Sequence, residues 1–212
     1  MGSASAETRP AGSRRALLTP HLWLLLVAAA CATRSQESDE TAAVHEPEPV
    51  SVEGWASETI PLPPGFAPGL PTGTEVLRFS PGFRDPVAGD FWSYAFVMWI
   101  DEAAPDVTRL DEMLEEYYDG LISAVAAGSE EDVGSDPAQV EVTRVAANMF
   151  EAKMQLIDAF TTFEPVDLIL RIEAIAESDR RTVLQIQASP QPTNHEIWRS
   201  LKAAIADIQE PR

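Results

Sequence analysis

The chain has 212 residues, of which 45% are hydrophobic and 23% are charged, and its formal net charge at pH 7 is -19. Binding to nucleic acid or to an anionic membrane surface depends on clustered lysine and arginine, so this balance argues against both functions. A solvated acidic surface is the simplest explanation for the charge.

The first 31 residues have the three-part layout of a secretory signal peptide. A polar stretch with Arg9, Arg14 and Arg15 precedes the apolar residues 22–30, which end in three alanines. This run is too short for a membrane span, because crossing a hydrocarbon core takes about 20 residues. We therefore predict export, and no later apolar run in the sequence is long enough to be a span.

Cys31, the only cysteine, follows this run directly, so a disulfide within the chain is impossible. Residues 28–31, Ala-Ala-Ala-Cys, resemble the bacterial lipobox, with Ala28 at the position that is usually leucine. The resemblance implies a lipoprotein whose Cys31 carries palmitate-type acyl chains. These would anchor it to a bacterial cell-envelope membrane, on the periplasmic or cell-surface face. The alternative is an ordinary signal peptide, cut after residue 30 or 32, with an incidental cysteine.

Residues 13–18, Ser-Arg-Arg-Ala-Leu-Leu, resemble the twin-arginine export motif, which implies export of the folded protein. The alternative is that Arg14 and Arg15 only supply the positive flank of a general secretory signal. The sequence leaves both routes open.

Residues 32–54 are rich in Glu, Ser, Thr and Pro and contain few large apolar side chains. Such a segment cannot bury enough surface to offset the entropy lost on ordering, so we predict a disordered acidic tether. Residues 55–212 are enough for one domain. They show no internal repeat with a period of about 20 to 50 residues.

The domain begins with three predicted strands. Residues 58–62 favour an edge strand, because Pro61 cannot donate to a ladder. Residues 75–80 form the next strand, and a turn-rich loop follows. Residues 90–101 are apolar on both faces, which predicts a central strand covered on both sides. One face carries Trp92, Tyr94, Phe96, Met98 and Ile100, and the other carries Phe91, Ala95, Val97 and Trp99.

A helix follows, with Thr108 and Asp111 as its predicted start and Gly128 as its stop. Its apolar stripe comprises Leu110, Met113, Leu114, Tyr117, Tyr118, Leu121, Ile122 and Val125. Its other face carries Asp111, Glu112, Glu115, Glu116 and Asp119. A solvated face is favoured there over a cation site, because a second set of ligands is missing. Residues 129–138 predict an exposed, mobile acidic loop without calcium-loop spacing.

The apolar period then changes to two, which predicts strands at residues 140–146, 150–160, 167–177 and 181–189. Their short connections, including a tight turn at residues 178–181, predict an antiparallel meander.

The final helix is predicted to begin at a capping box, in which Thr193 and Glu196 each bond the other's backbone. Trp198 is expected at the edge of its buried stripe. The stripe itself comprises Ile197, Leu201, Ala204, Ile205 and Ile208.

Few residues in the sequence suggest catalysis. His195 is the only histidine of residues 55–212, and its place at a helix start favours a structural or incidental role. The sequence contains no Gly-x-Ser-x-Gly elbow, phosphate loop, dinucleotide motif or cysteine–histidine cluster for zinc. We therefore predict no catalytic residue, no metal site and no cofactor.

The order of elements and two local sequences are similar to the PsbP/Mog-type α/β sandwich. Residues 60–66, IPLPPGF, lead a strand into a Pro-Gly-aromatic turn, and residues 182–208 contain a strand, a proline break and a Trp-containing helix. The resemblance implies an α+β fold, in which two main amphipathic helices pack an antiparallel sheet with a C-terminal meander.

The resemblance also implies a non-catalytic binding or assembly-accessory role. The predicted partners are membrane lipid, through Cys31, and a protein of the envelope, and nucleic acid is not expected. The alternative is a small cell-envelope hydrolase that uses a pair of carboxylates.

Overall fold

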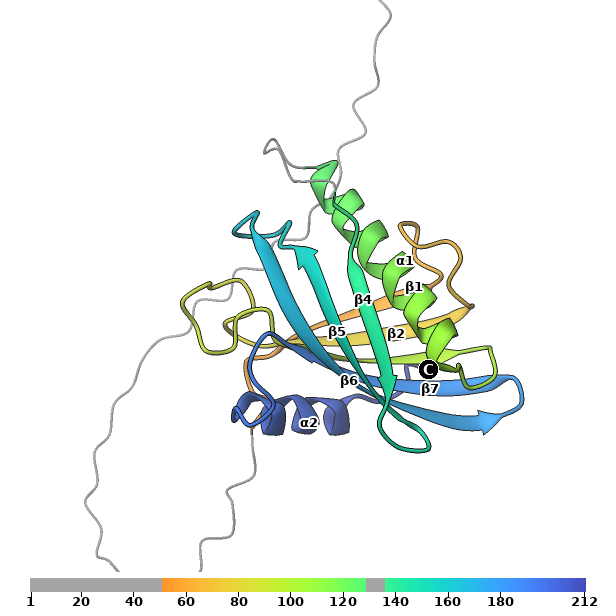
Figure 1. The fold of residues 1–212 in the computed structure, drawn as a ribbon. Coiled ribbons are helices and arrows are strands. Elements are labelled where there is room, and N and C mark those ends of the chain that lie inside the picture. Colours follow the sequence, from red (N-terminus) through yellow and green to blue (C-terminus); the bar gives the residue numbers. More distant parts are fainter. Residues whose placement is uncertain (1–50, 129–135) are drawn as a thin grey trace, which may run out of the picture. The chain divides into compact units, whose positions relative to one another are not determined.

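A seven-stranded antiparallel sheet and two helices make up residues 51–128 and 136–212, the part of the chain that the computed structural model describes (Figure 1). The elements are β1 (Ala56–Leu62), β2 (Gly73–Phe79), β3 (Tyr94–Ile100), α1 (Val107–Ala126), β4 (Gln139–Arg144), β5 (Met149–Ile157), β6 (Pro165–Ser178), β7 (Arg181–Ser189) and α2 (Ile197–Asp207). The predicted α+β class is confirmed. The predicted signal peptide, Cys31 and the tether up to residue 50 lie outside the described residues, as do residues 129–135 of the predicted acidic loop.

The strands lie in the order β1-β2-β3-β7-β6-β5-β4, and all neighbours are antiparallel. β4 to β7 form the predicted meander, with a tight turn between Ser178 and Arg181. β7 then pairs with β3, with Tyr94 opposite Ala188. This pairing joins the two halves of the chain into one sheet.

β3 lies near the centre of the sheet, and all seven of its residues are buried. Tyr94 and Phe96 pack on the side covered by α1, whereas Ala95 and Val97 pack on the side covered by α2. The prediction of a central strand is confirmed. The predicted place of Phe91 beside Ala95 is wrong, because Phe91 packs against the α1-side core. The strand begins only at Tyr94, and Trp92 has a positive φ of 50°, which interrupts the alternation.

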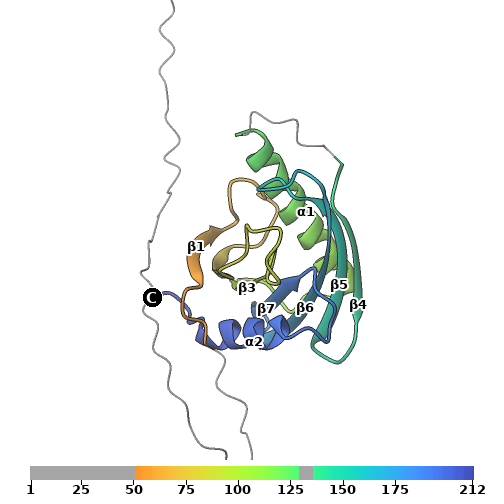
Figure 2. The same ribbon diagram turned by 90° about the vertical axis from the view of Figure 1, so that its left-hand side faces the viewer.

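α1 and α2 cover opposite faces of the sheet (Figure 2). Asp106 is the N-cap of α1, and its carboxylate accepts a hydrogen bond from the Arg109 N–H at 2.9 Å. The predicted start at Thr108 is therefore wrong, because Asp106 already caps the helix two residues earlier. α1 ends at Ala126, close to the predicted stop at Gly128.

The predicted capping box of α2 is wrong. Glu196 is the N-cap residue and makes no cap hydrogen bond through its side chain. His195 Nδ1 accepts a hydrogen bond from the Ile197 N–H instead, at 3.2 Å. Trp198 is buried rather than at the edge, and its indole N–H donates to the Pro192 carbonyl at 2.9 Å. The turn from Pro192 to His195 moves Thr193 out of the cap position.

Candidate functional site

Glu75 is the one glutamate that the described structure buries completely, with 0% of its surface exposed. It lies in the middle of β2, where strand alternation turns Glu75 and Leu77 toward α1 and Val76 toward α2. Its neighbours across the sheet are Ile60 on β1 and Met98 on β3. Glutamate is almost never fully buried without a partner, so the surroundings of this carboxyl group decide its state.

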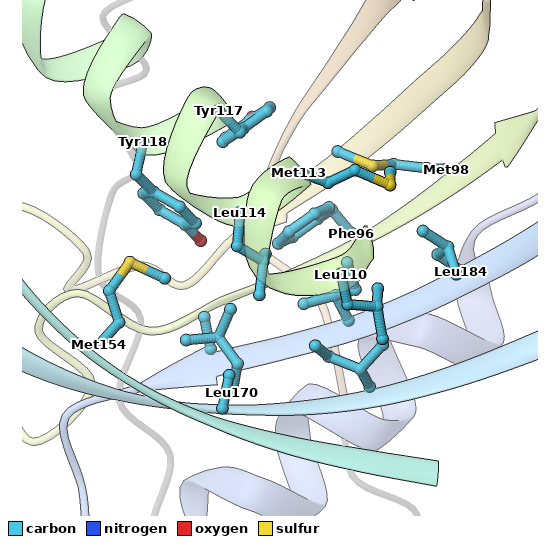
Figure 3. Packing of buried hydrophobic residues seen from close by; sticks show 14 of the residues in the cluster. Phe96, Met98, Leu110, Met113, Leu114, Tyr117, Tyr118, Met154, Leu170 and Leu184 are labelled. Carbon is cyan, nitrogen blue, oxygen red and sulfur yellow. The ribbon is translucent and has the colours of Figure 1, made fainter. Parts of the chain in front are cut away.

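Tyr117 of α1 is the partner of this carboxyl group. Its hydroxyl group donates to Glu75 and lies 3.1 Å from Oε1 and 3.3 Å from Oε2. The Tyr117 ring makes an edge contact with Phe66 and stacks on Phe96, with centroid distances of 5.4 and 6.1 Å. Figure 3 shows Tyr117 projecting from α1, with Phe96 and Met98 on the neighbouring strand. The packing therefore fixes the position of the hydrogen-bond donor.

A second buried hydrogen bond involves Tyr118, the residue after Tyr117 in α1. The hydroxyl groups of Tyr118 and Tyr94 are hydrogen-bonded to each other between α1 and β3. The rings of Tyr117 and Tyr118 also pack edge to face, with centroids 5.2 Å apart. Glu75 and these three tyrosines form one polar group inside the apolar core, which we call the Glu75 cluster.

Burial raises the pKa of Glu75 from 4.5 to about 8. The hydrogen bond from Tyr117 lowers the pKa, and the carboxylate of Glu58 on β1 makes a smaller upward contribution. Burial also raises the pKa values of Tyr94, Tyr117 and Tyr118. The protonated form of Glu75 therefore predominates at neutral pH, which is why the core tolerates a carboxyl group.

The Glu75 cluster is closed to solvent. The connection between β1 and β2, residues 63–72, packs against α1 and is called the strap below. Phe66 of the strap contacts the Tyr117 ring, and Leu70 is buried. Leu70, Met98 and Tyr117 line an apolar cavity of about 10 Å³, which has room for one water molecule at most. The cluster can hold or release a proton, but in this structure it offers no space for a substrate.

A second candidate lies on the other side of the sheet, where α2 packs mainly on β3 and β7 (Figure 2). Within the described residues no helix packs on the same side of β4 and β5, and α2 reaches only the neighbourhood of Ile169 and Arg171 on β6. We call this side of β4, β5 and β6 the open face. Cross-strand pairing sets Glu141 opposite Lys153 and Glu151 opposite Arg171. The side chains of the open face include Glu141, Thr143, Glu151, Lys153, Gln155, Asp167, Arg171 and Glu173, all exposed or half-buried.

Arg171 connects the open face to α2. Its guanidinium group lies over the Trp198 ring, 4.4 Å from the centroid, and donates to the Thr193 carbonyl at 3.1 Å. Gln155 donates to Asp167 at 2.8 Å. Both contacts hold polar groups in fixed positions, and arginine is one of the residues enriched at protein-binding surfaces.

The residues that the sequence singled out have structural roles or lie elsewhere. His195 Nδ1 accepts a hydrogen bond from the Ile197 N–H at the start of α2. Glu116 and Asp119, from the acidic face of α1, accept backbone hydrogen bonds from Gly69 and Ala138. Within residues 51–128 and 136–212, no three His, Cys, Asp or Glu side chains are grouped to hold a metal ion. Cys31 lies outside the described residues.

Sequence reasoning missed Glu75, although a signal was present. Glu75, Leu77 and Phe79 alternate along β2, so Glu75 occupies the apolar face of a strand that precedes the most apolar strand of the chain. A carboxylate at such a position predicts either an edge-strand surface or a buried acid. Only the pairing of β2 with β3 distinguishes the two cases.

Comparison of the chain with protein-family models, with curated proteins and with solved structures finds no match. None of the helices in the described residues is long and apolar enough to cross a membrane.

Proposed function

We propose that this protein is an exported bacterial lipoprotein, anchored to a cell-envelope membrane by lipid on Cys31. The position of the only cysteine carries the proposal, because Cys31 directly follows an export-type apolar run and precedes the polar residues 32–54. β1 begins at Ala56, directly after this polar segment, so the folded domain would be held on a short tether.

We further propose that the domain is a non-catalytic binding or assembly-accessory module. Its element order resembles that of PsbP/Mog-type proteins, which commonly act as accessory factors on larger complexes. The open face supports this role, since it presents cross-strand pairs of opposite charge and Arg171, and no helix of the described residues packs over β4 and β5 there. Such a polar surface suits a reversible contact with a protein of the envelope.

Replacement of the cysteine tests the anchor. We expect Cys31→Ala to leave the membrane fraction, whereas Ser35→Ala, a control in the predicted tether, should remain there as wild type does. Mass spectrometry of the N-terminal peptide should show a lipid-modified Cys31. An unmodified N-terminus, or a Cys31→Ala protein that still sediments with membranes, contradicts the proposal.

The raised pKa of Glu75 favours a second candidate, a hydrolase that uses carboxylates. Such an enzyme needs a second carboxyl group beside a substrate cleft. Glu58, which influences the pKa of Glu75, is exposed on β1, and the strap closes the way to Glu75. The full-length protein and Glu75→Gln should be assayed with ester, peptide and glycoside substrates. Turnover by wild type that Glu75→Gln lacks would replace the binding proposal with the hydrolase.

A further inference from the structure

Several segments that are far apart in the sequence meet at one end of the sheet. Ala56, the first residue of β1, pairs with Phe79 at the end of β2, and Phe79 pairs with Tyr94 at the start of β3. The predicted tether therefore enters the domain beside the loop of residues 80–93, which projects beyond β2 and β3 in Figure 1. The loop of residues 158–164, between β5 and β6, lies at the same end, because its Phe160 ring is 5.5 Å from the Trp92 ring. We call this the tether end of the domain.

The tether end carries one exposed apolar side chain and several half-buried ones. Val87, at the tip of loop 80–93, is 91% exposed and is the most exposed of the large hydrophobic residues in the described structure. Four phenylalanines of the two loops are half-buried, and the first three of them also pack against the core: Phe83, Phe91, Phe160 and Phe163. The guanidinium group of the exposed Arg84 lies 5.4 Å from the centre of the Phe160 ring. An exposed apolar residue, half-buried phenylalanines and an arginine at one end of a domain resemble the composition of surfaces that lie in a membrane interface.

Loop 80–93 presents Val87 in an ordered way. Asp85 Oδ1 accepts a hydrogen bond from the Val87 N–H at 3.1 Å, and Asp90 Oδ2 accepts one from the Gly82 N–H at 2.9 Å. Both carboxylates thus serve the backbone of the loop. A long connection without regular structure is usually functional, and this one holds an apolar residue in solvent where folding gains nothing from it.

Each of the two loops also contains an aromatic residue in a left-handed backbone conformation. Trp92 has a φ of 50° and Phe163 a φ of 59°. Bulky side chains avoid this region, and it is tolerated where the surroundings enforce it, often near functional surfaces. Here backbone hydrogen bonds from Trp92 to Phe83 and from Phe163 to Asp158 hold the loops in place.

We propose that the tether end is a lipid-contacting surface, which seats Val87 and the half-buried phenylalanines of the two loops in the interface of the bilayer that holds the anchor. This inference rests on the proposed lipidation of Cys31. As a flexible chain, the predicted tether of residues 32–54 would span about 25 Å, so it would keep the tether end within reach of the bilayer. The contact is apolar and aromatic rather than polybasic, which fits a chain with a net charge of -19.

The single native cysteine makes a direct test possible. Once Cys31 carries lipid, Val87→Cys introduces the only free thiol, which accepts a polarity-sensitive fluorophore. The matched control is Ala104→Cys, an exposed position after β3 at the opposite end of the sheet. Both full-length lipidated proteins are reconstituted into vesicles of zwitterionic phosphatidylcholine, with and without brominated acyl chains.

We expect the fluorophore at residue 87 to shift to the blue and to be quenched severalfold more by brominated lipid than the fluorophore at residue 104. Co-flotation of the protein with the vesicles reports the anchor separately. If the protein floats but residue 87 is as water-exposed as residue 104, the lipid-contact surface is wrong and the anchor stands. If the lipid-bearing protein is not obtained or does not float, both proposals fall.

Discussion

At the scale of single residues, the burial of Glu75 makes the stability of the domain depend on pH. The pKa of Glu75 is about 8 in the folded chain and 4.5 when the group is free in solvent. Between these values the folded chain keeps a proton that the unfolded chain loses. The contribution of Glu75 to the free energy of unfolding is therefore largest below pH 4.5 and falls by about 1.4 kcal/mol per pH unit until the pH passes the folded pKa.

Glu75→Gln should remove this dependence, because the amide is similar in size and does not ionise. Urea unfolding of wild type and variant should give similar stabilities near pH 4.5 and a widening advantage for the variant toward pH 8. Glu58→Gln, an exposed change on β1, should leave most of the slope in place. Parallel stability curves for wild type and Glu75→Gln would show that Glu75 ionises normally.

Gly120 is a second residue whose identity is dictated by packing, because there is no room for a side chain at this position. It lies inside α1, where alanine normally stabilises a helix by up to about 1 kcal/mol. A Cβ atom at this position, however, would lie 2.0 Å from the Phe66 carbonyl oxygen of the strap. We expect Gly120→Ala to lower the free energy of unfolding by about 1 to 3 kcal/mol, because the strap must shift.

The control for this prediction is Gly65→Ala, also in the strap, where an added Cβ meets nothing within 4 Å. Chemical denaturation should place Gly65→Ala close to wild type. A Gly120→Ala protein that is as stable as wild type would mean that the strap backbone does not lie in close contact with α1 at this position.

At the scale of elements, apolar periodicity predicted most of the strands and helices. It did not predict the first residue of each helix, which depends on hydrogen bonds. The two-sided apolar pattern of β3 identified the centre of the sheet, since only a doubly covered strand is apolar on both faces. Helix starts were less accurate. Asp106 caps α1, whereas the sequence favoured Thr108. α2 begins after Glu196 with the Ile197 N–H bonded to His195, whereas the sequence favoured Thr193. Each of the candidate capping residues has a side chain that can accept a backbone hydrogen bond. The path of the preceding loop determines which of them does so.

The acidic face of α1 allows a prediction about the helix itself. Glu115 lies four residues from Asp111 and four from Asp119, so like charges face each other on both sides. Glu115→Lys should turn two repulsions into attractions and raise the free energy of unfolding by about 0.5 kcal/mol at low salt. Glu115→Gln should give a smaller gain. Thermal unfolding in low and high salt measures both, and a gain that survives high salt would point to a cause other than charge.

At the scale of the whole molecule, the sequence did not predict which strands pair across long distances in the chain, nor the surfaces that this pairing creates. The β3–β7 ladder brings Tyr94 and Ala188 together, and no local pattern specifies that partner. The same ladder determines which loops share the tether end and which strands form the open face. The lipid on Cys31 remains a prediction from the sequence alone, and its test is independent of the fold.

The net charge of -19 allows a prediction for the whole chain. Mutual repulsion favours the unfolded chain, and salt screens it because the Debye length falls to about 10 Å at 0.1 M. At pH 7 we expect the midpoint of urea unfolding to rise as sodium chloride increases from about 0.01 to 0.2 M. Near the isoelectric point of about 4.4, where the net charge vanishes, the same salt should have much less effect. Equal salt effects at the two pH values would show that self-repulsion does not limit the stability of this fold.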